Sequence, residues 1–159
     1  MTRFHPHAFP LTRPFLCSAV LAFVSQATLA GTSCSFTSVS PLNFGAYEVF
    51  ATAPNNNGVG SLTISCNGAG NHSFSITLST GHSQSYASRA MRSGENHLNY
   101  NLYTSADRSA VWGDGTGGSQ VVAATKNKPA TFGVFGQIPF GQDVAIGTYS
   151  DTITTTVNF

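Results

Sequence analysis

The last stretch of the chain, residues 148–159, has the alternating pattern that most restricts the fold. Four large apolar side chains lie at odd-numbered positions of this stretch: Tyr149, Ile153, Val157 and Phe159. The even-numbered positions from 152 onwards hold only Thr and Asn. Because successive side chains of a strand point to opposite faces, this pattern predicts a strand with one buried face and one wet face. Asp151 interrupts the apolar face, and we expect the strand to emerge from its sheet there.

Shorter strand-like runs precede this stretch, and clusters of Gly, Asn, Pro and Ser separate them. None of the chain after Gly31 has a convincing helical period. Short strands with frequent turn signals are typical of an all-β sandwich. The expected strands before the last one are 34–39, 42–47, 61–66, 73–79, 98–103, 121–124 and 131–138.

The beginning of the chain has the pattern of a secretory signal peptide. Arg3 and Arg13 precede an apolar run at 15–24, and small residues follow it as far as Ala30. A basic segment, a short apolar segment and a small-residue cleavage site are the three parts of such a peptide. The run is shorter than the roughly 20 apolar residues that span a bilayer, so a membrane anchor or a buried helix is the weaker alternative. We expect cleavage after Ala30, with Ala27 as the second choice.

Residues 1–30 are therefore expected to be the signal peptide, and residues 31–159 a single exported domain. Of the seven Lys and Arg residues, two lie in the signal peptide, which leaves five against six acids and a net charge of about −1. No basic patch is expected to follow a nucleic-acid backbone, and no stable membrane insertion is expected. A weakly charged surface rich in Ser, Thr, Asn and Gly fits a secreted structural or adhesive protein better than a cytosolic enzyme.

The cysteines support export to an oxidising compartment. Cys17 lies in the signal peptide, so Cys34 and Cys66 are the pair that remains. A disulfide between them would close a loop of about 30 residues and contribute roughly 3–4 kcal/mol in the chain-entropy model. A metal site or a redox pair is the alternative, but there is neither a CxxC motif nor a Cys/His cluster. We therefore expect a structural disulfide, with no metal and no cofactor.

No motif in the sequence predicts an enzyme. There is no GxSxG nucleophile elbow, and the histidines of the expected domain lack the spacing of a zinc motif. These histidines, interpreted as solvated loop residues, are His72, His82 and His97. A glycosidase needs two carboxylates across a cleft, and only Asp107 with Asp114 stays open on that criterion. Turn and cap roles are the favoured interpretation of these two residues. Trp112 is interpreted as a partly buried aromatic beside a turn, with sugar stacking as the alternative.

Several short motifs, in order along the chain, resemble the spore coat protein U domain family, whose fold is that of archaic chaperone–usher (Csu-type) pilins. Both cysteines take their expected places in this order. The matching segments cover nearly all of residues 31–159: Cys34, 42–47, 60–66, 78–81, 89–91, 98–103, 112–115, 135–139 and 147–152.

This resemblance implies an incomplete immunoglobulin-like (pilin) β-sandwich with one disulfide and with its final strand missing. A periplasmic chaperone would first fill the groove that remains, and the N-terminal extension of a neighbouring pilin would then replace it by strand addition. Phe159 would be anchored by the chaperone through its carboxylate. Tyr149, Ile153 and Val157 would line the groove. The alternating strand ends at Phe159 without a hairpin partner, which fits an open edge, although an ordinary edge strand is the alternative.

The chain departs from the family's shaft subunits before its first cysteine. A donor strand needs about ten alternating positions, whereas cleavage after Ala30 leaves only residues 31–33 ahead of Cys34. The chain is therefore expected to accept a strand without donating one. We expect a secreted subunit of a chaperone–usher surface fibre, terminal in position, with a role in adhesion or biofilm. Its partners would be a chaperone, an outer-membrane usher and neighbouring pilins. The alternative is a spore-coat or matrix protein that is not assembled by strand exchange.

Overall fold

The computed structural model describes residues 32–159 except residue 69, and the expected signal peptide lies outside this part of the chain. Eight strands and one short 3₁₀ helix account for the regular structure of the described residues. In chain order they are β1 (Cys34–Ser40), β2 (Val59–Cys66), β3 (His72–Leu78), η1 (Gly81–Ser83), β4 (Arg89–Ser93), β5 (Asn96–Tyr103), β6 (Val122–Lys126), β7 (Ala130–Gln137) and β8 (Thr155–Asn158).

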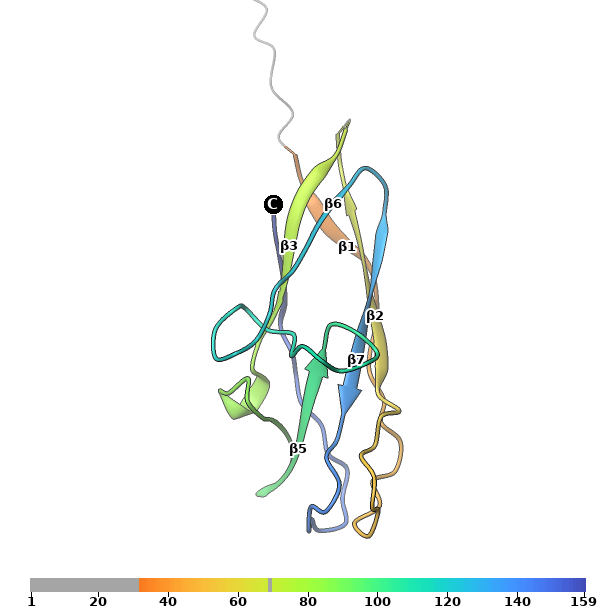
Figure 1. Ribbon diagram of the computed structural model, residues 1–159, viewed down its shortest axis with the longest axis vertical. Coiled ribbons are helices and arrows are strands. Elements are labelled where there is room, and N and C mark those ends of the chain that lie inside the picture. The colour runs from red at the N-terminus through yellow and green to blue at the C-terminus, as the bar shows by residue number, and fades with distance from the viewer. Residues whose placement is uncertain (1–31, 69) are drawn as a thin grey trace, which may run out of the picture.

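The strands form two antiparallel sheets, as Figure 1 shows. The larger sheet has the order β1-β2-β7-β5-β4, and the smaller has the order β6-β3-β8. β1 is thus an edge strand of one sheet, and β8 is an edge strand of the other. The start of β1 and the C-terminus lie at the same end of the molecule, and the loops after β1 and β7 lie at the opposite end (Figure 1).

The core lies between the two sheets and contains apolar side chains from both. Leu62 and Ile64 of β2 face Ile76 and Leu78 of β3 across it, and all four are buried. Phe74 meets Phe132 of β7 edge to face, with ring centroids 5.9 Å apart, which is a favoured geometry for an aromatic pair. This arrangement confirms the all-β sandwich that the sequence predicts.

The predicted disulfide is present between Cys34 and Cys66. The two residues are direct partners in the register of β1 and β2, with Cα atoms 4.0 Å apart. The bond therefore joins the first residue of β1 to the last residue of β2. Ser33 and Asn67 extend the pairing beyond it through a backbone hydrogen bond of 2.8 Å.

Trp112 is fully buried, so its interpretation as a partly buried aromatic, or as a sugar-stacking platform, is wrong. Its Nε1–H donates to the carbonyl oxygen of Ile76 at 3.0 Å. Its backbone N–H donates to Leu102 of β5 at 2.8 Å. The side chain therefore connects the larger sheet to β3 through the core.

Two strand predictions were inaccurate, and one strand was missed. Residues 42–47 run beside the sheet without joining it, and β4 was not predicted at all. The expected strand at 148–159 is regular only as β8, because Ser150 instead bridges to Arg92 of β4, in the other sheet. The chain changes sheets within the run that the alternation predicts as one strand.

No helix among the described residues has the length and apolar character that a membrane crossing requires.

Candidate strand-acceptor cleft

An apolar cleft of about 900 Å³ opens into the core between two segments of the chain. Residues 39–49, which comprise the end of β1 and the segment after it, form one wall. Residues 144–151 with Ile153 and Thr155 form the other. The floor consists of buried side chains of both sheets: Leu62, Leu78, Leu98, Leu102, Val134 and Ile138. The hydrophobic core is thus accessible along a line between the end of β1 and β8.

Three glycines allow the first wall to lie close to the larger sheet. A Cβ on Gly136 would lie 2.5 Å from the Phe44 ring and 2.8 Å from Leu42, and a Cβ on Gly58 would lie 2.4 Å from the same ring. Gly60 has the same relation to Leu42, at 2.8 Å. Real Cβ atoms do not approach that closely, so the missing side chains form a notch that receives Phe44 and Leu42. We call these three glycines and the space above them the glycine notch.

β8 borders the cleft with one side of its backbone unpaired. Its other side pairs with β3, in a register that places Val157 opposite Ile76 and Thr155 opposite Leu78. Among residues 32–68 and 70–159, no further strand pairs with β8. An edge of this kind offers a row of N–H and C=O groups to an incoming strand. The cleft therefore combines an apolar floor with a hydrogen-bonding edge.

The structure separates the four residues that were predicted to line a groove. Tyr149 and Ile153 are half-buried and line the cleft. Val157 packs against the core from β8 but is not part of the lining. Phe159 is 61% exposed and borders a shallow depression in the small sheet, beside Phe74. Their assignment to chaperone or donor-strand contact stays a prediction.

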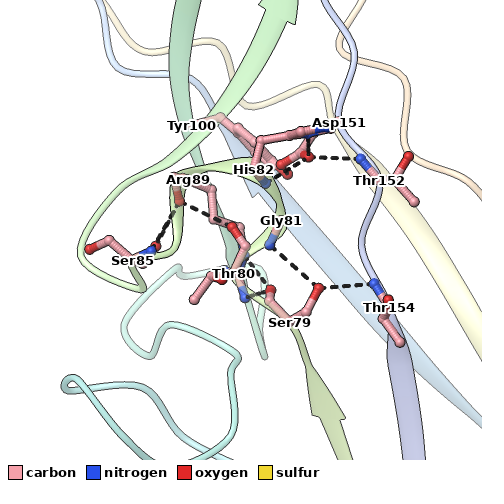
Figure 2. A network of polar contacts seen from close by, with 11 residues as sticks. Ser79, Thr80, Gly81, His82, Ser85, Arg89, Tyr100, Asp151, Thr152 and Thr154 are labelled. Atoms are coloured by element: carbon pink, nitrogen blue, oxygen red, sulfur yellow. Dashed lines mark hydrogen bonds and ion pairs between the residues drawn. The ribbon is translucent and has the colours of Figure 1, made fainter.

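Asp151 lies in the second wall and is the functional candidate that sequence reasoning misinterpreted. Its side chain is only 2% exposed, so the chain does not emerge from the fold there. The carboxylate accepts hydrogen bonds from Tyr100 Oη at 2.8 Å and from the Thr152 backbone N–H at 2.7 Å. His82 also binds it, through its backbone N–H at 3.2 Å and through its ring Nδ1 (Figure 2). His82, expected to be a free loop residue, is therefore tied to the cleft wall.

Burial raises the pKa of Tyr100 far above its ordinary value, and the hydrogen bond to Asp151 and the negative charge of that carboxylate raise it further. The phenol therefore keeps its proton and remains a donor to Asp151 across the physiological pH range. The alternating pattern gave no signal for this role, because it showed Asp151 only as an interruption of the apolar face. A buried carboxylate is stable only when donors such as these surround it.

Arg89 forms a second polar centre beside the first. Its side chain is fully buried, and burial lowers the pKa of its guanidinium. The guanidinium nonetheless has four hydrogen bonds: two to the Ser79 carbonyl oxygen at 3.0 and 2.8 Å, one to Asn101 and one to the Trp112 carbonyl oxygen, both at 2.7 Å. It also lies over the Tyr86 ring, 5.2 Å from its centroid. These contacts join the end of β3 to β5 and to the chain around Trp112.

The family model for the Spore Coat Protein U domain matches residues 19–156, which is most of the chain. The chain belongs to the Spore Coat Protein U domain family. Protein U of Myxococcus xanthus is a relative that is 32% identical over 130 residues, covering 74% of this chain and 71% of the relative. The resemblance that the sequence motifs indicate is therefore confirmed.

A solved structure shows the same fold as this Spore Coat Protein U domain. It is a chain of the CsuC–CsuE chaperone–tip adhesion subunit pre-assembly complex from archaic chaperone–usher Csu pili of Acinetobacter baumannii. The two chains superpose with a TM-score of 0.56 at 24% identity, over 80% of this chain. This protein spans about 40% of the length of that chain. At this identity the likeness shows a pilin-like fold.

The titratable residues of this Spore Coat Protein U domain are not grouped as metal ligands. No group of three or more His, Cys, Asp or Glu residues in the described part of the chain has the proximity to hold a metal ion. Asp107 and Asp114, the pair left open by the sequence, each bind neighbours within their own loops, Ser105 and Ser109 for Asp107 and Thr116 for Asp114. Both have a turn-stabilising role in the structure.

Proposed function

We propose that this protein is a secreted structural subunit of a chaperone–usher-type surface fibre, and that its cleft accepts a strand from a partner. The observation that carries the proposal is the apolar cleft bordered by the unpaired edge of β8. Membership of the Spore Coat Protein U domain family supports it, as does the pilin-like fold. The partners would be a periplasmic chaperone, an outer-membrane usher and neighbouring pilin subunits.

The geometry suits an extended strand. A strand beside β8 would exchange main-chain hydrogen bonds with its edge, and every second side chain would enter the cleft, because strand side chains alternate in direction. Leu78, Leu98 and Leu102 on the floor would receive apolar side chains. Burying the apolar side chains of the incoming strand in the cleft removes their surface from water, which stabilises the complex by about 25 cal/mol per Å². Tyr149 and Ile153 would contact the incoming strand directly, and Val157 would support the edge from beneath.

The finer proposal is a terminal, adhesive position in the fibre. It rests first on cleavage after Ala30, since residues 31–33 are too few to donate a strand. It rests second on exposed apolar side chains in loops at the end remote from the C-terminus: Phe50, Phe140 and Ile146. Tyr47 binds these loops together, accepting a hydrogen bond from the Gln142 N–H at 2.9 Å and donating one to Pro139 at 3.1 Å. N-terminal sequencing of the exported protein checks the cleavage site.

A secreted coat or matrix protein that does not use strand exchange is the second candidate function. The family's description as a spore coat domain favours it. The two candidates differ in what fills the cleft. A fibre subunit needs a strand from another chain, whereas a free coat protein must be stable without one.

The test is thermal unfolding of the exported protein with and without a synthetic donor peptide. The peptide is the N-terminal extension of a neighbouring fimbrial subunit, and the control is the same peptide with its apolar positions shifted by one residue. A hundredfold excess over Kd stabilises a protein by about 2.7 kcal/mol, so we expect Tm to rise by roughly 5–15 °C with the matched peptide alone. A stable monomer that responds to neither peptide would overturn the fibre proposal and favour the coat protein.

A further inference from the structure

The second wall of the cleft contains a short crossing between the two sheets, residues 150–154. At its beginning, Ser150 exchanges both backbone hydrogen bonds with Arg92 of β4, at 2.8 and 3.0 Å. At its end, Thr154 has two hydrogen bonds with Ser79, both of 2.9 Å. The Thr154 carbonyl oxygen accepts from the Ser79 backbone N–H, and the Thr154 backbone N–H donates to Ser79 Oγ. The crossing leads directly into β8. Its position therefore determines where the free edge of β8 begins.

Asp151 lies inside this crossing and binds it to the rest of the fold. Its four donors come from three parts of the chain: Tyr100 of β5, His82 of η1, and Thr152 of the crossing itself (Figure 2). The contact with η1 depends on Gly81, where a Cβ would lie 2.1 Å from Asp151 Oδ2. Gly81 also has a φ of +64°, a conformation that favours glycine. The surroundings are thus built to hold this carboxylate.

Arg89 stabilises the other end of the crossing from a distance. The guanidinium gives two hydrogen bonds to the carbonyl oxygen of Ser79, the residue whose N–H and Oγ hold Thr154. The first end of the crossing is therefore attached to the backbone of β4, and its other end to Ser79, which the buried Arg89 holds. Its centre is attached through the buried carboxylate of Asp151.

We propose that Asp151 is a positioning residue for strand acceptance, which holds the sheet crossing so that the edge of β8 is in place before a partner strand arrives. This inference rests on the proposed function. Loss of the carboxylate would leave the cleft residues present but the edge in place for only a fraction of the time. The apparent affinity for the strand is then the intrinsic affinity multiplied by that fraction. The decrease lies in the association rate, because the bound state keeps its contacts.

The experiment measures association and dissociation rates of the matched donor peptide. The variants are Asp151→Ala, Asp151→Asn and His82→Ala, and the controls are Asp143→Ala and His97→Ala. We expect Asp151→Ala to lower the association rate about tenfold or more, with a dissociation rate within about twofold of the unsubstituted protein. Asp151→Asn keeps an acceptor oxygen and should recover most of the loss. His82→Ala, which does not touch the cleft, should show a smaller loss of the same kind, and the controls should show none.

Hydrogen exchange of the peptide-free protein gives an independent measurement. We expect faster exchange at the amides of residues 152–157 in Asp151→Ala than in Asp143→Ala, with unchanged exchange in β2 and β7. If Asp151→Ala does not fold, His82→Ala decides the question by the same two measurements. Unchanged association rates and unchanged exchange in the variants would overturn the inference. A protein that binds no donor peptide at all would refute the proposed function, and the exchange measurement would still decide whether Asp151 positions β8.

Discussion

Trp112, Arg89 and Asp151 are buried side chains that carry hydrogen-bonding groups into a chain with few charges. Each connects segments that the strand ladders do not join: Trp112 reaches Ile76, and Asp151 reaches η1 and β5. Every buried side-chain nitrogen and oxygen in the described residues has a hydrogen-bond partner. Because an unpaired buried polar group costs about 1–3 kcal/mol, removing either partner of such a contact should be more destabilising than the apolar area alone suggests.

Replacing Trp112 with Phe tests this expectation. The substitution removes the Nε1–H that donates to Ile76 and leaves a void beside a fully buried ring position. We expect the free energy of unfolding to fall by about 2–4 kcal/mol, measured by urea denaturation followed by circular dichroism. The control is Phe140→Leu at an exposed position, which should change it by less than about 0.5 kcal/mol. Equal stability of Trp112→Phe and the control would contradict a bridging role for the indole.

The strands differ in how far the sequence predicts them. Alternation and turn residues predict β2, β3, β5 and β7 well, because turn-forming residues bound each of these runs at both ends. They miss the interruption between Ser150 and Thr154, since Tyr149, Ile153 and Val157 keep the same period on both sides of it. A period of two reports which side chains are buried, and it does not report which neighbouring strand the backbone joins.

The wall at 39–49 was predicted in part as a strand for a similar reason. Leu42, Phe44 and Tyr47 have the composition of a strand, but Leu42 and Phe44 pack into the glycine notch. Tyr47 packs against the core. Gly58 and Gly136 are 78 residues apart in sequence and meet only in the folded sheet, where Gly136 N–H donates to the Gly58 oxygen at 2.6 Å. No local pattern predicts such a contact. The cleft, which depends on this wall, was therefore foreseen only through the resemblance to a family.

The glycine notch gives a test by a double-mutant cycle. Gly136→Ala would place a methyl group against the Phe44 ring, and we expect it to lower the free energy of unfolding by about 1–3 kcal/mol. Phe44→Leu removes the ring atoms that this methyl group would contact. The loss of unfolding free energy in the double variant should therefore be smaller, by about 0.5 kcal/mol or more, than the sum of the losses in the two single variants. Phe74→Leu, a buried substitution away from the notch, should combine additively with Gly136→Ala. Additivity in both cycles would contradict the close packing described above.

At the scale of the whole molecule, the disulfide contributes stability to a domain whose core is partly open at the cleft. Cys34 and Cys66 enclose a loop with a sequence separation of 32 residues, and that loop contains the first wall of the cleft. Closing a loop of this size stabilises the folded state by about 3–4 kcal/mol in the chain-entropy model. A domain of this size has a total stability of only about 5–15 kcal/mol.

We therefore expect the double substitution Cys34→Ser with Cys66→Ser to lower the free energy of unfolding by about 3 kcal/mol in urea. Reducing agent added to the unsubstituted protein should produce the same change and should leave the double variant unaffected. The donor peptide should restore part of the lost stability, because it binds only the folded state. Equal stability of the oxidised protein and the double variant would show that the bond adds nothing to the fold.

The place of the disulfide also decides how the protein would bear a mechanical load. A force applied to the chain ahead of Cys34 acts first on Cys34, the first residue of β1. The disulfide transmits this force to Cys66, the last residue of β2. β2 has a hydrogen-bonded neighbour on each side, β1 and β7, whereas β1 has only one. The force therefore does not break the hydrogen bonds between the edge strand β1 and β2 one after another. A tether attached at that end would instead pull on an interior strand, where many hydrogen bonds must break together.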